Sequence, residues 1–277
     1  MKKFACGIVT FFPDTQVMKR IEEYSEVFNK VYVYDNTPRK EQSFNQIKNN
    51  SNILIYANGK NDGLSKAYNF FINNTLGNFE FLCTMDQDSK FDKCNIISII
   101  DYINRNDMSK VAIIGPKIEY RDSHNIIKKN EILSKRYLIS SGSFLNLPLL
   151  ELADISFDSN YFIDRVDADL CAQCLDNGYR VLEYSGSILY QTLGQRTTFS
   201  KIGNHTYKRH YYIFRNRFYF NRKFISNKYK RIIVDFMQST KHCLCILLFE
   251  SQKFKKIKQI IFALKDYRQN NMGRGRY

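Results

Sequence analysis

The chain has 277 residues, of which 44% are hydrophobic and 15% aromatic, a composition that excludes a disordered chain and predicts a folded protein with a sizeable core. Its formal net charge of +15 predicts an anionic partner, such as a phosphorylated substrate, an anionic lipid surface or a nucleic acid. The seven cysteines have neither the spacing of a disulfide framework nor that of a zinc site, so we expect reduced thiols in a cytosolic protein.

Short apolar segments alternate with amphipathic helical patterns over the first 115 residues. The predicted strands cover residues 4–10, 31–34, 53–56, 79–85 and 111–114. The predicted helices cover residues 15–28 and 62–76, and the second has Asn61 or Asp62 as its N-cap. Strands that alternate with helices predict an α/β fold with a parallel, doubly wound sheet.

The remaining chain is less regular and then becomes helical. Residues 117–148 are typical of shorter β segments joined by turns, and residues 164–177 have a helical pattern that stops at Gly178. Residues 207–224 and 228–267 form long, basic, helical patterns. Because no run of about 18 uncharged apolar residues occurs, we expect no membrane-spanning helix.

Three of the predicted strands end in polar residues, namely Thr10, Asp35 and Asp86. Ligands of parallel α/β sheets bind beyond the carboxyl ends of the strands, which share one edge of the sheet. Asp86 also begins the sequence Asp86-Gln87-Asp88, which follows a strongly hydrophobic segment. Two carboxylates at a strand end are typical ligands of Mg²⁺ or Mn²⁺, which in turn binds diphosphate oxygens. The alternative is a turn in which both aspartates cap the following helix.

Several segments occur in an order and spacing that one enzyme family shares. They are Gly7-Ile8-Val9-Thr10-Phe11-Phe12-Pro13, Val33-Tyr34-Asp35-Asn36, Gly63-Leu64-Ser65-Lys66-Ala67-Tyr68-Asn69, Asp86-Gln87-Asp88-Ser89, Ser141-Gly142-Ser143, residues 162–171 and residues 209–216. On these motifs the chain resembles inverting family 2 glycosyltransferases of the bacterial rhamnosyltransferase-like group, over roughly residues 4 to 220. The resemblance implies a GT-A fold, a Rossmann-like α/β fold with a mostly parallel central sheet flanked by helices, followed by a helical C-terminal extension.

The resemblance also implies a division of the chain and an activity. A GT-A catalytic domain would cover residues 1–225, with a nucleotide-sugar-binding half at 1–115 and an acceptor half at 116–225, and a basic amphipathic helical extension would cover residues 226–277. The implied reaction is metal-dependent, inverting transfer of rhamnose or a similar sugar from a dTDP- or UDP-sugar to a hydroxyl of a saccharide. The implied process is the synthesis of a bacterial surface polysaccharide, such as capsule or O-antigen.

The resemblance assigns roles to individual residues. Those expected at the nucleotide sugar are Thr10, Phe12, Asp35, Asn61, Lys66, Asp86, Gln87 and Arg215. Those expected at the acceptor are Ser141, Gly142, Ser143 and Asp164, and those expected at a Mg²⁺ or Mn²⁺ ion are Asp86, Asp88 and Gln191. The expected catalytic base is Asp167, which would take the proton of the acceptor hydroxyl.

Some of these residues have a purely structural alternative. Asp35 could form an Asx turn with Asn36, and Asp164 could cap the helix that follows it. The segment of Ser141 to Ser143 could be a plain tight turn. Asp169 is the alternative base, although on a regular helix it points about 160° away from Asp167.

Two residues depart from the pattern of the family. Val166 stands where many relatives have an acid immediately before the base, and Gln191 stands where relatives often have a metal-binding histidine. Glutamine offers a carbonyl oxygen, which suits a hard ion better than a transition metal. We therefore expect a weaker metal dependence than usual, or a site that water completes.

The C-terminal third combines apolar residues with many lysines and arginines. This pattern predicts contact in the plane of an anionic membrane surface, and hence a cytoplasmic protein at the inner face of the cell membrane. A solvated basic face on helices that pack on the catalytic domain is one alternative, and a homodimer interface is another. Acceptors in the family are often sugars on a lipid diphosphate, which favours membrane contact.

Two other functions remain open from the residues alone. A sugar nucleotidyltransferase would have a Gly- and Arg-rich phosphate loop after the first strand, where this chain has Phe11-Phe12-Pro13-Asp14. A non-enzymatic nucleic-acid-binding protein would present interleaved basic and aromatic residues, as residues 208–222 do. The loop does not fit the first function, and the second does not account for three polar strand ends at one edge, so we expect a glycosyltransferase with no nucleic-acid partner.

Overall fold

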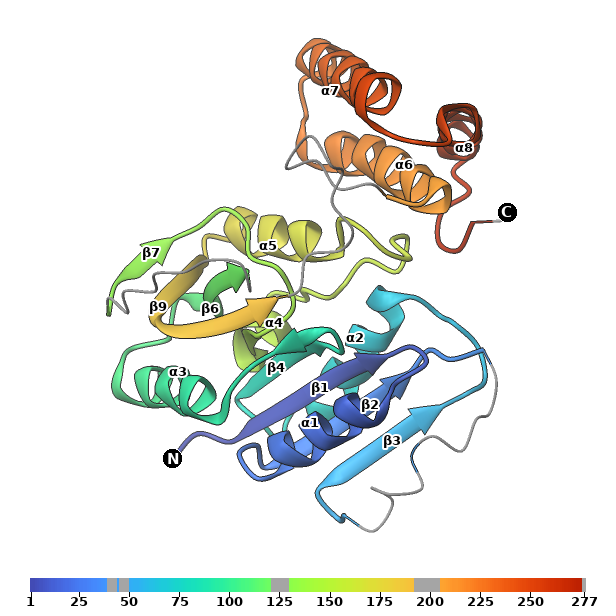
Figure 1. Ribbon diagram of the computed structural model, residues 1–277. Helices are drawn as coiled ribbons and strands as arrows, with labels where there is room; N and C mark the ends of the chain where they lie inside the picture. The colour runs from blue at the N-terminus through green and yellow to red at the C-terminus, as the bar shows by residue number, and fades with distance from the viewer. Residues whose placement is uncertain (39–43, 45–49, 121–129, 192–204, 276–277) are drawn as a thin grey trace. The chain divides into compact units, whose positions relative to one another are not determined.

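The computed structural model describes residues 1–38, 44, 50–120, 130–191 and 205–275, which form two compact units (Figure 1). The first unit contains Met1–Asp158 and the described residues from Asp167 to Gln191. The second contains Ser159–Val166 and the described residues from 205 onward. The division expected from the sequence, into a catalytic domain at 1–225 and an extension at 226–277, concerns function and stays a prediction.

One nine-stranded sheet forms the centre of the first unit. Its strands are β1 Phe4–Thr10, β2 Lys30–Asp35, β3 Ile53–Ala57, β4 Phe81–Asp86, β5 Ser89–Lys90, β6 Val111–Tyr120, β7 Ile132–Ser134, β8 Ser143–Asn146 and β9 Arg180–Gln191. The order across the sheet is β3-β2-β1-β4-β8-β6-β9-β5, and β7 pairs with β9. The helices are α1 Thr15–Ser25, α2 Leu64–Thr75, α3 Lys93–Arg105, α4 Leu147–Leu152 and α5 Val166–Asp176.

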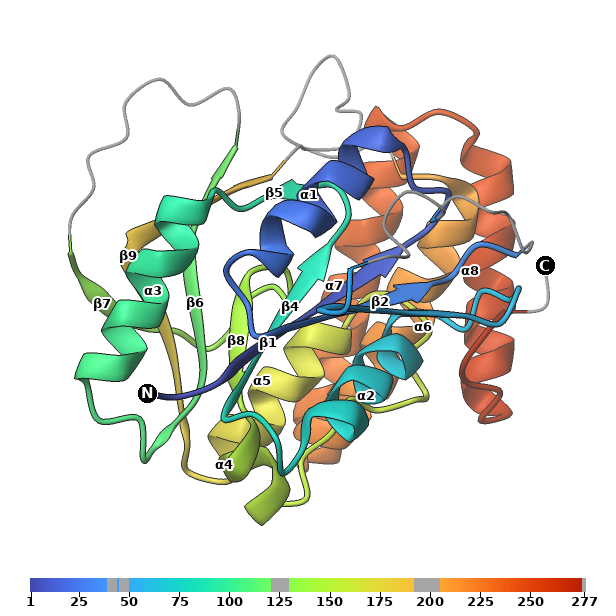
Figure 2. The same cartoon turned by 90° about the horizontal axis from the view of Figure 1, so that it is seen from below.

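The half of the sheet that contains β1, β2, β3 and β4 is parallel, as the sequence predicts. β1 pairs in parallel with β2 and β4, and β2 pairs in parallel with β3 (Figure 2). The other half is mixed, because β8 runs antiparallel to both β4 and β6, and β9 runs parallel to β6 but antiparallel to β5 and β7. The predicted α/β class is confirmed, while the description "mostly parallel" holds for the first half only.

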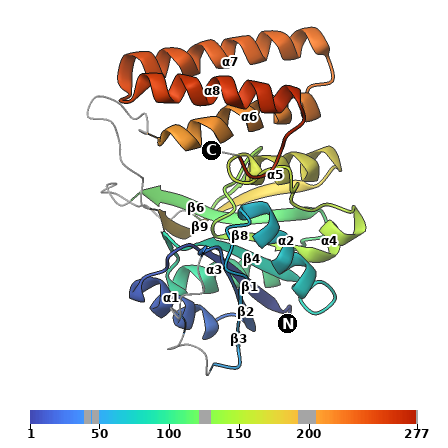
Figure 3. The ribbon, with the colours of Figure 1, turned by 90° about the vertical axis from the view of Figure 1, so that its right-hand side faces the viewer.

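Helices cover both faces of this sheet, with α1 and α3 on one side and α2 on the other (Figure 3). Ile21 of α1 and Ile99 of α3 join Ile8 of β1 in the main hydrophobic core. Gly7 points to the opposite face, where a β-carbon at this position would lie 2.3 Å from the ring of Phe71 in α2. Glycine at position 7 is therefore what allows α2 to pack closely against β1.

The helix predicted at residues 164–177 begins later than expected, because α5 starts at Val166. Asp164 and Arg165 both have positive φ angles, of 63° and 69°, a left-handed conformation that a right-handed helix does not contain. The prediction that Asp164 belongs to this helix is therefore wrong. α1 also ends at Ser25, before the predicted residue 28.

The described part of the second unit contains three helices, α6 Tyr207–Phe224, α7 Lys228–Phe249 and α8 Lys253–Arg268. α6 has the predicted bounds. Residues 228–267, predicted as one long helical pattern, form two helices because the chain turns between them, where Gln252 has a left-handed φ of 53°. α6 packs on its neighbours through a small apolar core that includes Phe214, Ile246 and Ile260.

Within the described residues, α7 is a helix long and apolar enough to cross a membrane by length and composition, although the sequence was expected to contain none. Its most apolar stretch has a mean hydropathy of 1.4, and only 6% of that stretch is buried. A single helix of this kind is weak evidence for a membrane span. Its exposed apolar side chains are Ile232, Ile233, Phe236, Met237, Leu244, Leu247, Leu248 and Phe249. An apolar surface of this extent is typical of an interaction site.

Candidate active site

The polar ends of β1, β2 and β4 lie together at one edge of the sheet. Thr10 pairs with Asp35 across β1 and β2, and Asp86 pairs with Val9 across β1 and β4. Thr10 is fully buried, and its Oγ1 donates a hydrogen bond to Oδ1 of Asp35 over 3.0 Å. The structure therefore brings together the three strand ends whose convergence the sequence predicts.

Asp35 forms an Asx turn, and its partner is Thr37, not Asn36. Its Oδ1 accepts hydrogen bonds from the backbone N–H and the hydroxyl of Thr37, over 3.2 and 2.7 Å. The side chain is buried, with 3% of its surface exposed. The turn explains why an aspartate ends this strand, and its recognition of a nucleotide base stays a prediction.

The loop after β1 is tied to the end of β4 by Gln87. The side-chain Oε1 of Gln87 accepts a hydrogen bond from the N–H of Phe11 over 2.8 Å, and its Nε2 donates to the carbonyl of Phe11 over 2.9 Å. Phe12 has a φ of 48°, and its N–H donates to Oγ1 of Thr37 over 2.8 Å. Because Phe12 is 52% exposed, its ring offers a flat apolar surface beside this loop.

The two aspartates of the predicted metal site differ in their surroundings. Asp86 is half-buried, its Oδ1 accepts a hydrogen bond from the hydroxyl of Tyr68 over 2.8 Å, and its N–H donates to Oγ of Ser141 over 3.2 Å. Asp88 is exposed, and it forms no hydrogen bond or ion pair with other described residues. The protein thus fixes the first carboxylate and presents the second to solvent.

These carboxylates fit a hard divalent cation by their chemistry. Oxygen ligands are those that Mg²⁺ and Mn²⁺ prefer. Gln191 lies opposite Ser89 in the pairing of β5 with β9, so it is close to the residue that follows Asp88. Among the described residues, no group of three or more His, Cys, Asp or Glu side chains is placed to hold a metal. An ion here would therefore need oxygens from substrate or water in addition to the aspartates.

The loop of Ser141, Gly142 and Ser143 is a tight turn bound to the end of β4. The N–H of Gly142 donates to the carbonyl of Thr84 over 2.7 Å, and Ser143 pairs with Thr84 across β8 and β4. Gly142 has a φ of 79°, and a β-carbon there would lie 3.1 Å from Pro116, so the turn requires glycine. Both serine side chains are buried. The structural alternative is thus realised, and contact with an acceptor stays a prediction.

The start of α2 is tied to the end of β2. The N-cap is Gly63, with a φ of 84°, and Oδ1 of Asn61 accepts a hydrogen bond from its N–H over 3.0 Å, so the predicted N-cap at Asn61 or Asp62 is wrong. The N–H of Asp62 donates to Oδ1 of Asn36 over 3.0 Å. The side chain of Lys66 is 63% exposed, and its Nζ lies 3.8 Å from Oδ1 of Asp62. This helix start, without a side-chain cap and with an exposed lysine in its first turn, has the chemistry of an anion site.

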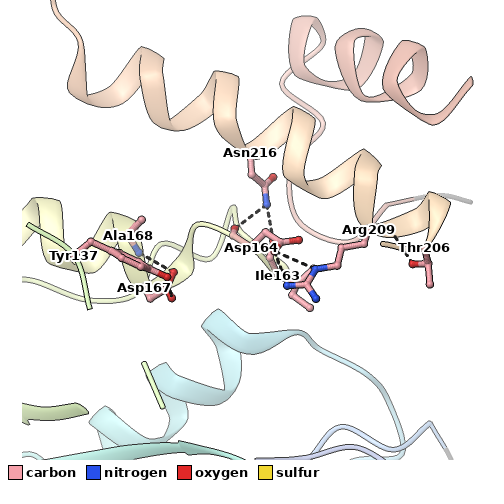
Figure 4. Close-up of polar contacts among 8 residues, drawn as sticks. All are labelled: Tyr137, Ile163, Asp164, Asp167, Ala168, Thr206, Arg209 and Asn216. Carbon is pink, nitrogen blue, oxygen red and sulfur yellow. Dashed lines mark hydrogen bonds and ion pairs between the residues drawn. The ribbon is translucent and has the colours of Figure 1, made fainter. Parts of the chain in front are cut away.

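Asp167 lies in the first turn of α5, and its carboxylate is half-buried (Figure 4). Its Oδ2 accepts a hydrogen bond from the hydroxyl of Tyr137 over 2.6 Å, and its Oδ1 accepts one from the N–H of Ala168 over 2.9 Å. Asp169 is fully buried and accepts a hydrogen bond from Nε2 of Gln173 over 2.6 Å. Burial keeps Asp169 from any acceptor, so Asp167 is the better candidate for the base.

Tyr68 is a buried tyrosine whose hydroxyl donates to the aspartate at the end of β4. The side chain is 1% exposed, and burial raises the pKa of Tyr68 well above its usual value of 10.0. The charge of Asp86 and the hydrogen bond to it raise this pKa further, and so does the charge of Asp167. The hydrogen bond joins Tyr68 to Asp86, while Asp167 acts on Tyr68 through its charge alone.

Asp164 belongs to the second unit, where α6 holds it (Figure 4). Its Oδ1 accepts hydrogen bonds from Nε and Nη2 of Arg209 over 3.4 and 3.1 Å, and its carbonyl accepts one from Nδ2 of Asn216 over 3.1 Å. Its Oδ2 is buried and has no hydrogen-bond partner among the described residues. These contacts explain the left-handed backbone at this residue, and its predicted contact with the acceptor stays a prediction.

Arg215 is 1% exposed, so its guanidinium lies inside the second unit. It donates hydrogen bonds to the hydroxyl of Tyr211 over 3.0 Å and to the carbonyls of Asn271 and Gly273 over 3.1 and 2.6 Å. These bonds anchor the C-terminal segment to α6. They use the same N–H groups that a phosphate would need, so the geometry favours an anchoring role, and the predicted donor contact stays untested.

Sequence reasoning missed the two tyrosines that donate to the candidate functional carboxylates. Tyr68 lies within the motif of residues 63–69, where its apolar spacing indicates a core residue and gives no sign of its hydroxyl. Tyr137 lies 30 residues from Asp167 along the chain, and no local pattern connects the two. Only the folded arrangement of the segment before β8 beside α5 shows the contact.

Comparison with known proteins gives one family model, one relative and two solved structures that are similar to this chain. Residues 31–158 match the family model described as Glycosyl transferase family 2. The chain is 27% identical over 294 residues to the dTDP-rhamnosyl transferase RfbF of Shigella flexneri, covering 98% of this chain and 97% of that protein. The structure of S. aureus TarS 1–349 in complex with UDP-GlcNAc aligns with a TM-score of 0.61 at 16% identity, over 96% of this chain and 81% of that one. GalNAc-T7 with UDP, GalNAc and Mn²⁺ aligns with a TM-score of 0.53 at 9% identity, over 79% of this chain and 51% of that one. Both structures show a shared fold.

Proposed function

Because the chain carries a family 2 glycosyltransferase domain on a GT-A fold, we propose that it transfers rhamnose or a similar sugar from a dTDP- or UDP-sugar to a hydroxyl of a saccharide acceptor. The process would be the synthesis of a bacterial surface polysaccharide. The observation that carries the proposal is the meeting of Thr10, Asp35 and Asp86 at one edge of the sheet. The near full-length similarity to a dTDP-rhamnosyl transferase supports this choice of donor.

The nucleotide sugar would bind at the carboxyl edge of the parallel strands. Asp35 would recognise the base, because a carboxylate can accept the N3–H of uracil or thymine. The exposed ring of Phe12 would cover the nucleotide, and Lys66 with the N-terminal N–H groups of α2 would attract the diphosphate. All of these residues lie in the first unit, so donor binding does not depend on how the second unit is placed.

A divalent cation, Mg²⁺ or Mn²⁺, would be held by Asp86 and Asp88, with Gln191 as a third oxygen donor. Such an ion supplies charge neutralisation for the departing diphosphate. The exposed carboxylate of Asp88 can meet an ion that arrives with the nucleotide, while the bonds from Tyr68 and Ser141 keep Asp86 in position. Because a glutamine is a poor ligand for a transition metal, we expect weak metal binding in the absence of nucleotide.

Asp167 would act as the general base of an inverting transfer. The acceptor hydroxyl gives its proton to the carboxylate of Asp167, and its oxygen forms a bond to the anomeric carbon. The bond between that carbon and the diphosphate oxygen breaks, and the nucleoside diphosphate leaves from the opposite face of the sugar. One bond forms and one breaks at the anomeric carbon, so the configuration inverts. The hydrogen bonds to Asp167 keep its carboxylate oriented for this step.

The second unit would attach the enzyme to the inner face of the cell membrane. Apolar residues of α7 are exposed, with Phe236 at 71% and Leu248 at 67%, and lysines and arginines accompany them on α7 and α8. Apolar side chains with a basic surround fit an anionic bilayer surface. Hydrogen bonds connect α6 to α7: Nδ2 of Asn221 donates to Oδ1 of Asp235 over 2.7 Å, and Nη2 of Arg217 donates to Oγ of Ser239 over 3.1 Å. These bonds favour a helix that lies in the membrane plane over one that crosses it.

Sedimentation with lipid vesicles tests this membrane proposal. We expect the protein to sediment with phosphatidylglycerol vesicles and to be released when Phe236 and Leu248 are both changed to Ser, while the exposed Leu152→Ser variant of the first unit still binds. The same apolar surface could instead join two copies of the chain. A stable dimer in solution that ignores vesicles, and that the double variant converts to a monomer, would replace the membrane proposal with a homodimer.

The stereochemistry of the product tests the proposed reaction. The protein is incubated with dTDP-rhamnose or a UDP-sugar, Mn²⁺ and a saccharide acceptor, and the anomeric configuration of the new linkage is read by NMR. We expect a configuration opposite to that of the donor, and a residual rate about 100- to 10,000-fold lower in Asp167→Asn, since that is the range that a general base contributes. A product with retained configuration would exclude Asp167 as a base for single displacement.

The rival functions, a sugar nucleotidyltransferase and a nucleic-acid-binding protein, are not favoured by the family match.

A further inference from the structure

Tyr137 lies outside the sequence motifs that carry the resemblance, yet it contacts the candidate base. Its hydroxyl donates to Oδ2 of Asp167 over 2.6 Å. We propose that Tyr137 is a positioning residue for Asp167, which fixes the orientation of the carboxylate and stabilises its charged form. This inference rests on the proposed function, in which Asp167 takes the proton of the acceptor.

The geometry holds both oxygens of the carboxylate at once. Oδ1 accepts a hydrogen bond from the N–H of Ala168 over 2.9 Å, while Oδ2 accepts the bond from Tyr137 (Figure 4). A distance of 2.6 Å is in the range of charge-assisted O–H···O⁻ bonds, which are stronger than neutral ones. With one donor on each oxygen, the carboxylate plane cannot rotate freely about its bond to the β-carbon. The direction from which an acceptor hydroxyl must approach is then set before the acceptor binds.

The backbone places Tyr137 independently of this hydrogen bond. The next residue, Leu138, is 6% exposed, and its carbonyl accepts a bond from Sγ of Cys171 in α5 over 3.6 Å. On the other side, the N–H of Lys135 donates to the carbonyl of Val181 in β9 over 2.9 Å. The segment is thus tied both to the helix that carries Asp167 and to the sheet. These contacts position the backbone at Tyr137 next to α5 without the help of the hydrogen bond to Asp167.

Tyr137 and Tyr68 donate to different carboxylates and differ in exposure. Tyr68 is 1% exposed and donates to Asp86, whereas Tyr137 is 47% exposed and donates to Asp167. Asp86 and Asp167 therefore each have one tyrosine donor. Because Tyr137 is about half exposed, water can reach its side chain. An exposed ring could also contact the acceptor directly, so the test must separate that role from positioning.

The change Tyr137→Phe removes the hydroxyl and keeps the ring. We expect kcat to fall about tenfold, because a charge-assisted hydrogen bond is lost at a partly exposed site. The hydroxyl favours the charged form of the base, so without it the base stays protonated to a higher pH. The acid limb of the kcat/KM profile should therefore move up by about one pH unit. Tyr102→Phe, a partly buried tyrosine of α3 stacked on Tyr184, should leave both measurements unchanged.

A double-mutant cycle then separates positioning from acceptor binding. If Tyr137 acts through Asp167, adding Tyr137→Phe to Asp167→Asn should cause no further loss of rate. A full tenfold loss in that background, or a rise in the KM of the acceptor with an unmoved acid limb, would show direct substrate contact and overturn the inference. Equal kcat and equal acid limbs for Tyr137→Phe and the active unaltered protein would overturn it as well. If the unaltered protein transfers no sugar from any donor, the proposed function itself fails.

Discussion

The buried hydroxyl of Tyr68 should control how tightly the proposed metal site binds a divalent cation. It donates to Oδ1 of Asp86 over 2.8 Å, and Asp86 is the fixed member of the predicted pair of metal ligands. Tyr68→Phe removes one oxygen atom and leaves the ring packed against Phe157, with ring centroids 4.8 Å apart. The variant should therefore fold, because the apolar contacts of the ring are retained.

The magnitude follows from the charge on the acceptor. A hydrogen bond to a charged group contributes about 1.5–3 kcal/mol, and the loss of a residue that orients a metal ligand lowers metal affinity by about 10- to 100-fold. Tyr68 is 1% exposed, so water has little room to replace the lost donor. We therefore expect the Mn²⁺ concentration for half-maximal activity to rise by about 10- to 100-fold in Tyr68→Phe.

The assay is the release of nucleoside diphosphate at saturating nucleotide sugar, after treatment with a chelator and titration with Mn²⁺. Tyr184→Phe is the matched control, since Tyr184 is 8% exposed and stacks on Tyr102 with ring centroids 4.6 Å apart. It should bind Mn²⁺ like the unaltered protein. The reasoning is refuted if Tyr68→Phe folds, is active, and has the Mn²⁺ dependence of the control.

Two further predictions concern the buried polar cluster of the second unit. Lys256 donates to Oε2 of Glu250 over 2.6 Å, and both side chains are buried, so Lys256→Met should lower the free energy of unfolding of this unit by about 3–5 kcal/mol. The double variant Lys256→Met with Glu250→Gln should recover most of that loss, measured by denaturant unfolding followed by circular dichroism. Equal stabilities of the single and the double variant would contradict this prediction. Burial, with Arg217 and His210 nearby, lowers the pKa of His242 from 6.5 to about 4. In the unfolded state His242 takes up a proton near pH 6.5, whereas in the folded state it stays neutral until about pH 4. The free energy of unfolding should therefore be highest above pH 6.5 and fall by up to about 3 kcal/mol as the pH drops towards 4. Hydrogen exchange of residues 228–249, corrected for intrinsic rates, should show this loss, and it should be smaller in His242→Gln.

The sequence was sufficient for those features that depend on local pattern. The alternation of strands and helices predicts the first half of the sheet, and this alone brings Thr10, Asp35 and Asp86 to one edge. The capping residue Thr206 and a long amphipathic pattern give α6 its predicted bounds. Each of these features is determined by residues that are close together in the chain or by a general rule of parallel sheets.

The remaining features depend on contacts between distant residues. Asp164 has the sequence context of a helix N-cap, but Arg209 and Asn216 of α6 hold it in a left-handed conformation. Residues 228–267 look like one helix, yet the chain turns at Gln252, and the buried pair of Glu250 and Lys256 lies on either side of that turn. The contact of Tyr137 with Asp167 is of the same kind. No periodic pattern records such pairs.

The most direct test of the proposed activity is nucleoside diphosphate release from a panel of nucleotide sugars, comparing the unaltered protein with Asp88→Asn. Asp92→Asn is the matched control, because Asp92 is a nearby surface aspartate that pairs with Lys90 over 3.0 Å. We predict release from dTDP-rhamnose or a UDP-sugar, about 100-fold slower in Asp88→Asn and unchanged in Asp92→Asn. No release from any donor, or equal rates in Asp88→Asn and the unaltered protein, would contradict a glycosyltransferase site at this edge of the sheet.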